Sequence, residues 1–206
     1  MKALKMIRSR LLLPLLLALA ALLLPVTALA APSPQTFVKQ KHVQLTALLK
    51  KPKSAATEKK IQRIFDQLLD YHSLAKHSLG EYWDKRSDAE RKDFENVLER
   101  LVRNAYRKNL RKTLDYKIDY KGEAKAKEGY LVKTVAKSRT NAREDPVSID
   151  YTLHKVDGKW RVYDIVTEGS SLVNNYRSQF RRIIKKKGFD DLMSRMKKKL
   201  DKEEAS

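Results

Sequence analysis

The stretch KWRVYDIVTEGSSLVNNYRSQF, residues 159–180, joins two kinds of secondary-structure pattern and decides the fold class. Its first half has the pattern of a β-strand, and its second half has the spacing of an α-helix. Between the two halves lie one acid, one glycine and two serines. This corner is either an active site or a joint between a strand and a helix.

Upstream of this stretch, apolar and polar residues alternate with a period of two, which predicts further β-strands. Asp157-Gly158 is typical of a tight hairpin turn, so the strand before it pairs antiparallel with the strand after it. We therefore expect a four-stranded antiparallel meander. The expected strands begin near Tyr116 and continue over residues 129–138, 147–153 and 159–166.

Helical patterns stand on both sides of the strands. The strongest one begins at Ser87, which forms a capping box with Glu90 ahead of apolar residues spaced by three and four. Thr57 is the expected N-cap of an earlier helix. The expected helices cover residues 32–54, where Pro52 ends the helix, and 56–70, 71–80, 87–114, 170–185 and 189–202.

This order of elements predicts an α+β fold, with the N- and C-terminal helices packed on one face of the sheet. The apolar stripes of the helices are wide for a small domain. Such a layer forms a solid core or parts into a ligand cavity, and periodicity alone leaves both open.

At the corner itself, no second catalytic group accompanies the acid and the serines, so we interpret the corner as a joint. We expect Gly169 to let the chain turn and Ser170 or Ser171 to cap the next helix. Glu168 is expected near the N-terminus of that helix, where a negative charge is favourable.

The first 30 residues have the pattern of a secretory signal peptide. A basic start is followed by an apolar run and by Ala28-Leu29-Ala30, a small-x-small cleavage motif. An uncleaved membrane anchor is the alternative, which Pro14, Pro25 and the cleavage motif disfavour. We expect cleavage near Ala30, which leaves residues 31–206 as a single exported domain, periplasmic if the host is a Gram-negative bacterium.

The chain has 206 residues, a formal net charge of +20 and no Cys. The absence of Cys excludes a disulfide framework and a lipid-modified Cys. A basic balance usually favours nucleic acid as the partner. Export argues against that partner and leaves lipid head groups, membrane surfaces and acidic proteins. The basic runs at residues 181–187 and 197–199 are either solvated helix faces or a surface for transient contact with anionic membranes.

Residue patterns of catalytic and metal sites are missing from the sequence. The four His residues show no i, i+4 pair, so solvated or hydrogen-bonded histidines are favoured over metal ligands. There is no Cys nucleophile, no G-x-S-x-G motif and no glycine-rich phosphate loop. We therefore expect a protein that is not an enzyme and that needs no cofactor or metal.

Two motifs resemble those of the MlaC family, also called the toluene-tolerance auxiliary family. The first is the stretch at residues 159–180, and the second is LGEYWDKRSDAERKDFENVLERLVRNAY at residues 79–106. KGFDDLMSRM at residues 187–196 is a weaker match. The matching residues are Leu79, Gly80, Tyr82, Trp83, Arg91, Phe94, Leu98, Leu101, Tyr106, Trp160, Val162, Tyr163, Asp164, Glu168, Gly169, Ser171, Leu172, Tyr176, Arg177, Phe180, Gly188 and Leu192.

The resemblance implies helices packed on a four-stranded antiparallel sheet, with a deep apolar pocket between them. It implies a ligand, the acyl tails of a glycerophospholipid, with the head group near solvent. The implied role is a periplasmic phospholipid shuttle of an ABC-type lipid transport system, which maintains the lipid asymmetry of the outer membrane. The implied partners are an inner-membrane complex of an MCE-domain protein, an ATPase and a permease, and an outer-membrane lipoprotein–porin complex.

The expected lining of this pocket combines the apolar stripe of the long helix with strand residues that face it. Ordinary core packing is the alternative for each of these side chains. The expected lipid-contacting residues are Leu79, Trp83, Leu98, Val102, Tyr106, Leu110, Val132, Val135, Val147, Ile149, Tyr151 and Leu172.

Three other functions stay open on the sequence alone. The same pocket would suit another hydrophobic ligand, such as a sterol-like, polyprenyl or solvent molecule. An exported α+β enzyme would need inward His or carboxylate groups, and His154 is out of phase with the apolar residues of its strand. An adaptor that only bridges membranes would have a filled core.

Overall fold

The computed structural model describes residues 32–205, so the expected signal peptide lies outside the described residues. The sheet is an antiparallel meander in which each strand pairs with the next one along the chain, as predicted. A two-residue fifth strand, which was not predicted, pairs with the end of the fourth. In sheet order the strands are β1 (Tyr116–Ala126), β2 (Gly129–Ser138), β3 (Val147–Val156), β4 (Lys159–Thr167) and β5 (Ser170–Ser171).

The turn between β3 and β4 has the geometry that its sequence predicts. Asp157 and Gly158 both have positive φ, at 49° and 74°, as the two central residues of a type I′ hairpin turn require. This turn twists with the strands and fixes their antiparallel pairing. It therefore sets which side chains of β3 and β4 share a face.

The two faces of the sheet differ in burial. In β2, Val132 and Thr134 are buried, whereas Lys133 between them is exposed. The register pairs Val132 with Tyr151 of β3 and Thr134 with Ile149, so these four side chains share one face. This buried face is the one that the helices cover, and we call it the inner face.

Helices precede and follow the sheet in the predicted order. No helix within residues 32–205 combines the length and the apolar composition needed to cross a membrane. The helices are α2 (Pro34–Leu49), α3 (Ala55–Leu68), α4 (Tyr71–Leu79), α5 (Asp88–Asn109), α6 (Leu172–Lys187) and α7 (Phe189–Glu204), with the 3₁₀ turns η2 (Gly80–Tyr82) and η3 (Leu110–Asp115).

Side-chain caps explain where these helices begin. The predicted capping box of α5 is confirmed, because Ser87 Oγ accepts the Glu90 N–H at 3.3 Å and Glu90 accepts the Ser87 N–H at 2.7 Å. The predicted cap of α3 was wrong. Ser54, three residues earlier than Thr57, has an extended backbone, and its Oγ accepts the Thr57 N–H at 3.2 Å. A serine just before the helix accepts a backbone N–H of the first turn that has no partner within the helix. Thr57 lies inside the helix and does not accept such a bond.

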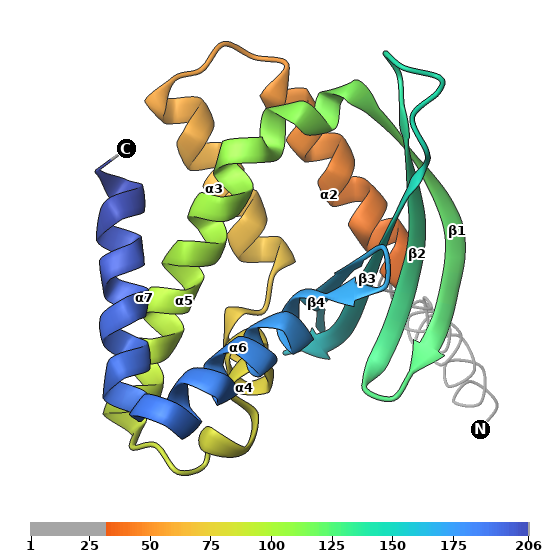
Figure 1. Ribbon diagram of the computed structural model, residues 1–206. Coiled ribbons are helices and arrows are strands. Elements are labelled where there is room, and N and C mark those ends of the chain that lie inside the picture. The colour runs from red at the N-terminus through yellow and green to blue at the C-terminus, as the bar shows by residue number, and fades with distance from the viewer. Residues whose placement is uncertain (1–31, 206) are drawn as a thin grey trace, which may run out of the picture. The chain divides into compact units, whose positions relative to one another are not determined.

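The helices form a layer on one side of the sheet (Figure 1). Helices α2 and α6 pack against the strands, whereas the main neighbours of the long helix α5 are α4 and α7. Phe94 of α5 is fully buried, and its ring lies 5.5 Å from that of Phe180 in α6 and 6.3 Å from that of Phe189 in α7. Each such aromatic residue contributes on the order of 2 kcal/mol by burial. These three helices therefore share one part of the main core, which also includes buried residues of α2, α4 and the inner face of the sheet.

The corner between β4 and α6 is the joint that the sequence suggested, with one correction. Ser171 caps α6, as its Oγ accepts the Asn174 N–H at 3.0 Å. The acid at the N-terminus of α6 is Asp164, which accepts hydrogen bonds from the Ser171 hydroxyl at 2.6 Å and the Val173 N–H at 3.0 Å. Glu168 turns back instead and accepts the Ser148 N–H of β3. Its positive φ of 49° reverses the chain direction there, which the residue types do not reveal.

Candidate functional site

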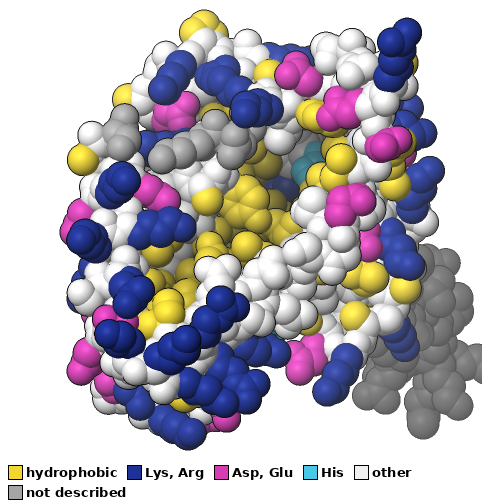
Figure 2. Space-filling model, in the orientation of Figure 1, with side chains coloured by type: hydrophobic (Ala, Val, Ile, Leu, Met, Phe, Trp, Pro, Cys, Tyr) yellow, Lys and Arg dark blue, Asp and Glu magenta, His cyan; other side chains and the backbone are white. Residues whose placement is uncertain are grey.

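A hollow lined by hydrophobic side chains opens on the face of the molecule shown in Figure 2. It lies between the helices and the strands, and Lys and Arg side chains predominate around it. Several hydrophobic residues that pack on the main core remain only half-buried, and we take those between the helices and the inner face as candidates for the wall of the hollow. They include Phe65 of α3, Tyr106 of α5, Tyr176 of α6, and Ile149 and Ile165 on the inner face of the sheet.

Some of the residues expected to contact a ligand are sealed in the core. Leu79, Leu98, Val102 and Val132 are each at most 2 % exposed. Their role in this structure is packing that supports the wall. Tyr151 is also buried. Five further residues of the expected lining have half-buried side chains: Tyr106, Leu110, Val147, Ile149 and Leu172.

Two of the expected residues lie elsewhere. Val135 pairs with Ser148 and shares its face with Lys133 and Lys137, so it is on the outer face of the sheet. Val132 and Val135 are three apart, and an odd spacing on a strand reverses the face. Trp83 lines a polar groove between the start of α5 and α4.

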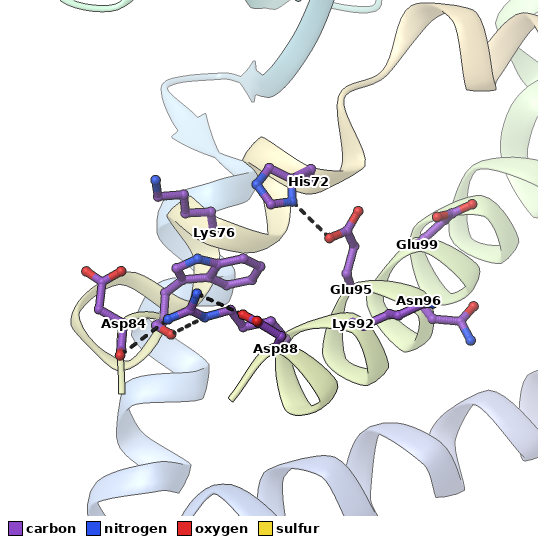
Figure 3. Close-up of a pocket in the computed structure, with 10 residues that line it drawn as sticks. His72, Lys76, Asp84, Asp88, Lys92, Glu95, Asn96 and Glu99 are labelled. Carbon is purple, nitrogen blue, oxygen red and sulfur yellow. Dashed lines mark hydrogen bonds and ion pairs between the residues drawn. The ribbon is translucent and has the colours of Figure 1, made fainter. Parts of the chain in front are cut away.

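The polar groove, of about 690 Å³, is shown in Figure 3. His72 of α4 turns toward Glu95 of α5, with 3.0 Å between Nδ1 and Oε2. Arg91 donates from Nε to the Trp83 carbonyl at 3.0 Å and from Nη2 to the Asp84 carbonyl at 3.3 Å. These contacts fix the loop that precedes α5. In residues 32–205, no group of three or more His, Cys, Asp or Glu side chains is placed to hold a metal ion.

Tyr106 is a half-buried residue of α5 that packs against the main core. Its ring stacks on Phe65 of α3, with centroids 5.8 Å apart and an interplanar angle of 22°. Burial, followed by the nearby Tyr176, raises the pKa of Tyr106 well above its ordinary value, so the phenol stays neutral. Its hydroxyl makes no hydrogen bond to any described residue, and it is not sealed from solvent.

A histidine and two tyrosines form a polar cluster where α2 meets the inner face. His42 Nδ1 lies 2.6 Å from the Tyr120 hydroxyl, and His42 Nε2 lies 3.1 Å from the Tyr151 hydroxyl. Burial lowers the pKa of His42 to about 4, because a charged imidazole loses its hydration there. The cluster is therefore neutral at neutral pH.

Other residues of the wall were not predicted, for different reasons. Phe65 lies on a helix stripe that the sequence shows clearly, so its helical spacing was a usable signal. Ile165 was not predicted because β4 contains a bulge. Thr152 pairs with Asp164 but Leu153 pairs with Val162, so the register shifts by one residue between them. The bulge puts Ile165 on the same face as Val162, which an unbroken alternation would forbid.

These features define a class of protein: an α+β fold whose helices cover one face of an antiparallel sheet and part around an apolar hollow. The family model for the MlaC protein matches residues 39–198, and the chain belongs to the MlaC family.

Among solved structures, the chain is similar to a phospholipid-binding protein from Ralstonia solanacearum in complex with a phospholipid. The two share 20 % sequence identity and a TM-score of 0.72, over 84 % of this chain and 99 % of that one. At this identity the likeness shows the fold. A comparison with curated proteins found no match.

Proposed function

We propose that the exported chain binds a glycerophospholipid, with its acyl tails in the hollow and its head group near solvent. The observation that carries this proposal is the apolar hollow between the helices and the inner face of the sheet (Figure 2). Membership of the MlaC family and the phospholipid complex of the Ralstonia solanacearum protein support the same ligand.

The physical need for such a site follows from the cost of exposing acyl tails to water. Each methylene that leaves an apolar environment costs about 0.8 kcal/mol, so free passage through an aqueous compartment is negligible. A protein hollow replaces one apolar environment with another, which keeps the exchange close to neutral. A carrier needs that balance, because much tighter binding would prevent release.

The proposed lining is drawn from the half-buried residues of the wall, together with Tyr151, which is buried on the inner face of the sheet. Val135 and Trp83 are left out because of where they lie. The proposed lipid-contacting residues are Phe65, Tyr106, Leu110, Val147, Ile149, Tyr151, Ile165, Leu172 and Tyr176.

We further propose that the protein acts without catalysis. Each His side chain is engaged by the protein itself: His42 by two tyrosines, His72 by Glu95, His77 by Glu128 and His154 by Asp70. His42 lies against Tyr151 of the inner face, and burial keeps it neutral. The carrier role then requires only an apolar lining and an accessible opening.

As the finer role, we propose a periplasmic shuttle between an outer-membrane lipoprotein–porin complex and an inner-membrane complex of an MCE-domain protein, an ATPase and a permease. The basic end of α6 fits contact with anionic surfaces on this route. Lys185, Lys186 and Lys187 are exposed and form no ion pair with any residue from 32 to 205. Near an anionic membrane each basic residue contributes about 1 kcal/mol of attraction.

Two neighbouring residues of β4 provide a matched test of binding and transfer. Ile165 faces the hollow, whereas Val166 pairs with Asp150 and faces outward. Ile165→Glu should abolish transfer of a fluorescent phospholipid from donor to acceptor vesicles, because a carboxylate in the wall repels acyl tails. Val166→Glu should leave transfer close to wild type. Equal transfer by both variants, or no transfer by the wild-type protein, would count against the proposal.

A further inference from the structure

Two cationic side chains meet at the end of α3, where both bind the same residue, Gln67. Lys41 of α2 donates from Nζ to the side-chain oxygen Oε1 of Gln67 at 2.7 Å. Arg161 of β4 donates from Nη1 to the backbone carbonyl of Gln67 at 2.7 Å and to the Trp160 carbonyl at 3.2 Å. Gln67 therefore holds an ammonium group and a guanidinium group beside each other at the junction of α2, α3 and β4.

This cation pair has no acidic partner. Neither Lys41 nor Arg161 forms an ion pair with any residue from 32 to 205. The two acids closest to Gln67 in the sequence are engaged elsewhere: Asp66 Oδ1 lies 2.5 Å from Arg103 Nη2, and Asp70 Oδ2 lies 2.6 Å from His154 Nε2. The positive charge of the pair is therefore not balanced by a neighbouring carboxylate.

Holding two cations together without an anion is unfavourable, and only one of them has a structural reason to be there. Arg161 binds a carbonyl in the last turn of α3, where a cation is favoured by the helix dipole. Lys41 binds a side chain instead, and its ammonium lies over the Phe37 ring at 5.7 Å. Burial, followed by the charge of Arg161, lowers the pKa of Lys41. An anion placed beside the pair would remove this repulsion.

The pair also has hydrogen-bond donors to spare. Lys41 has three N–H hydrogens on Nζ and uses one of them for Gln67. Arg161 uses Nη1, which leaves Nη2 and Nε without a partner in the described part of the chain. An anion with several oxygens can accept from both groups at once, and such charge-assisted bonds are short and strong.

We propose that Lys41 and Arg161 form a binding site for a phosphate group. Both side chains are half-buried, so an anion can reach them from solvent while losing part of the screening by water. Two sources supply this chemistry: the head group of a bound phospholipid and free inorganic phosphate. The first source rests on the proposed function, whereas the second does not.

The first arm of the test uses inorganic phosphate alone. The mature chain is dialysed to equilibrium against labelled phosphate at low ionic strength, and bound phosphate is counted. Lys41→Met and Arg161→Met should each weaken binding by at least about fivefold, because each removes a charge and its hydrogen bonds. Lys39→Met is the matched control, since Lys39 is exposed on the same helix and has no partner within residues 32–205. This control should bind phosphate as wild type does.

The second arm uses lipids that differ in the phosphate. The same four proteins are incubated with vesicles holding equal amounts of dipalmitoyl-phosphatidylglycerol and dipalmitoylglycerol and are then re-isolated, and their lipid is quantified by mass spectrometry. Wild-type protein and Lys39→Met should be enriched in the phospholipid. Lys41→Met and Arg161→Met should each lower this enrichment by at least about fivefold.

The two arms separate the sources and the failures. A loss of enrichment in the lipid arm assigns the site to the head group, and a loss in the dialysis arm alone assigns it to free phosphate. Equal effects of Lys41→Met and Lys39→Met, or no phosphate preference of wild type in either arm, would overturn the inference. Uptake of neither lipid by wild type would contradict the proposed function, and the dialysis arm would still test the site. Arg161→Met also removes a bond to α3, so Lys41→Met keeps the test decisive if that variant folds poorly.

Discussion

Acidification is expected to destabilise the protein through His42. The fold favours the neutral imidazole, since burial lowers the pKa of His42 to about 4 from 6.5. The unfolded chain therefore binds more protons than the folded chain as the pH falls. The contribution of neutral His42 is complete above pH 6.5 and is lost progressively as the pH falls toward about 4.

The size of this effect follows from the two pKa values. Between pH 7 and pH 5, the free energy of unfolding should fall by about 2 kcal/mol through His42 alone. With a urea dependence of about 2 kcal/mol per molar, this moves the midpoint of urea unfolding by about 1 M. The side chain is largely buried, so solvent screening removes little of the effect.

A His42→Gln variant separates this contribution from all other titrating groups. Glutamine has a donor and an acceptor for the two tyrosines but does not titrate. Urea unfolding at pH 7 and at pH 5 should show a loss about 2 kcal/mol larger in wild-type protein than in the variant. The same loss in both proteins would show that His42 is not held neutral by burial, and would refute the reasoning.

Three further predictions concern the core, the sheet and the surface. Phe94→Ala should lower the free energy of unfolding by about 3–5 kcal/mol in urea titrations, because the ring is 0 % exposed; a loss below about 1 kcal/mol would contradict its place in the core. Gly129→Ala should destabilise the protein by at least about 2 kcal/mol more than Gly122→Ala, because a Cβ added at Gly129 would meet the Leu153 carbonyl oxygen at 2.0 Å, whereas nothing lies within 4 Å of a Cβ added at Gly122. Thermal unfolding of the two variants tests this difference, and equal losses of stability would contradict the close packing at Gly129. Replacing all three lysines of residues 185–187 by Glu should weaken sedimentation with anionic vesicles at low salt by at least about tenfold, and unchanged binding would exclude this surface from membrane contact.

The sequence was sufficient to predict most of the fold because local signals agree with the tertiary structure. The alternation in β1 to β4, the Asp157-Gly158 turn and the capping box at Ser87 all operate within a few residues. The start of α3 and the role of Glu168 were mispredicted because several residues of suitable type stood close together. Which of them caps or bonds depends on backbone angles that residue types do not fix.

The candidate site was less predictable than the fold. Helical spacing put Leu98, Val102 and Tyr106 on one apolar stripe of α5. In the structure Tyr106 is half-buried, whereas Leu98 and Val102 are sealed. One apolar stripe of α5 contains both sealed and half-buried residues. The spacing of the residues does not show which of them are sealed, because that depends on how α5 packs in the folded protein. The bulge that turns Ile165 inward and the pairing of His42 with two tyrosines are long-range features without a local signal.

Native mass spectrometry of the mature chain, purified without detergent or added lipid, tests the central claim most directly. The account predicts that the protein carries a co-purified glycerophospholipid whose mass is released on collisional activation and confirmed by extraction. Wild-type protein that is folded and carries no lipid, or that carries only a molecule without acyl chains, would contradict the account.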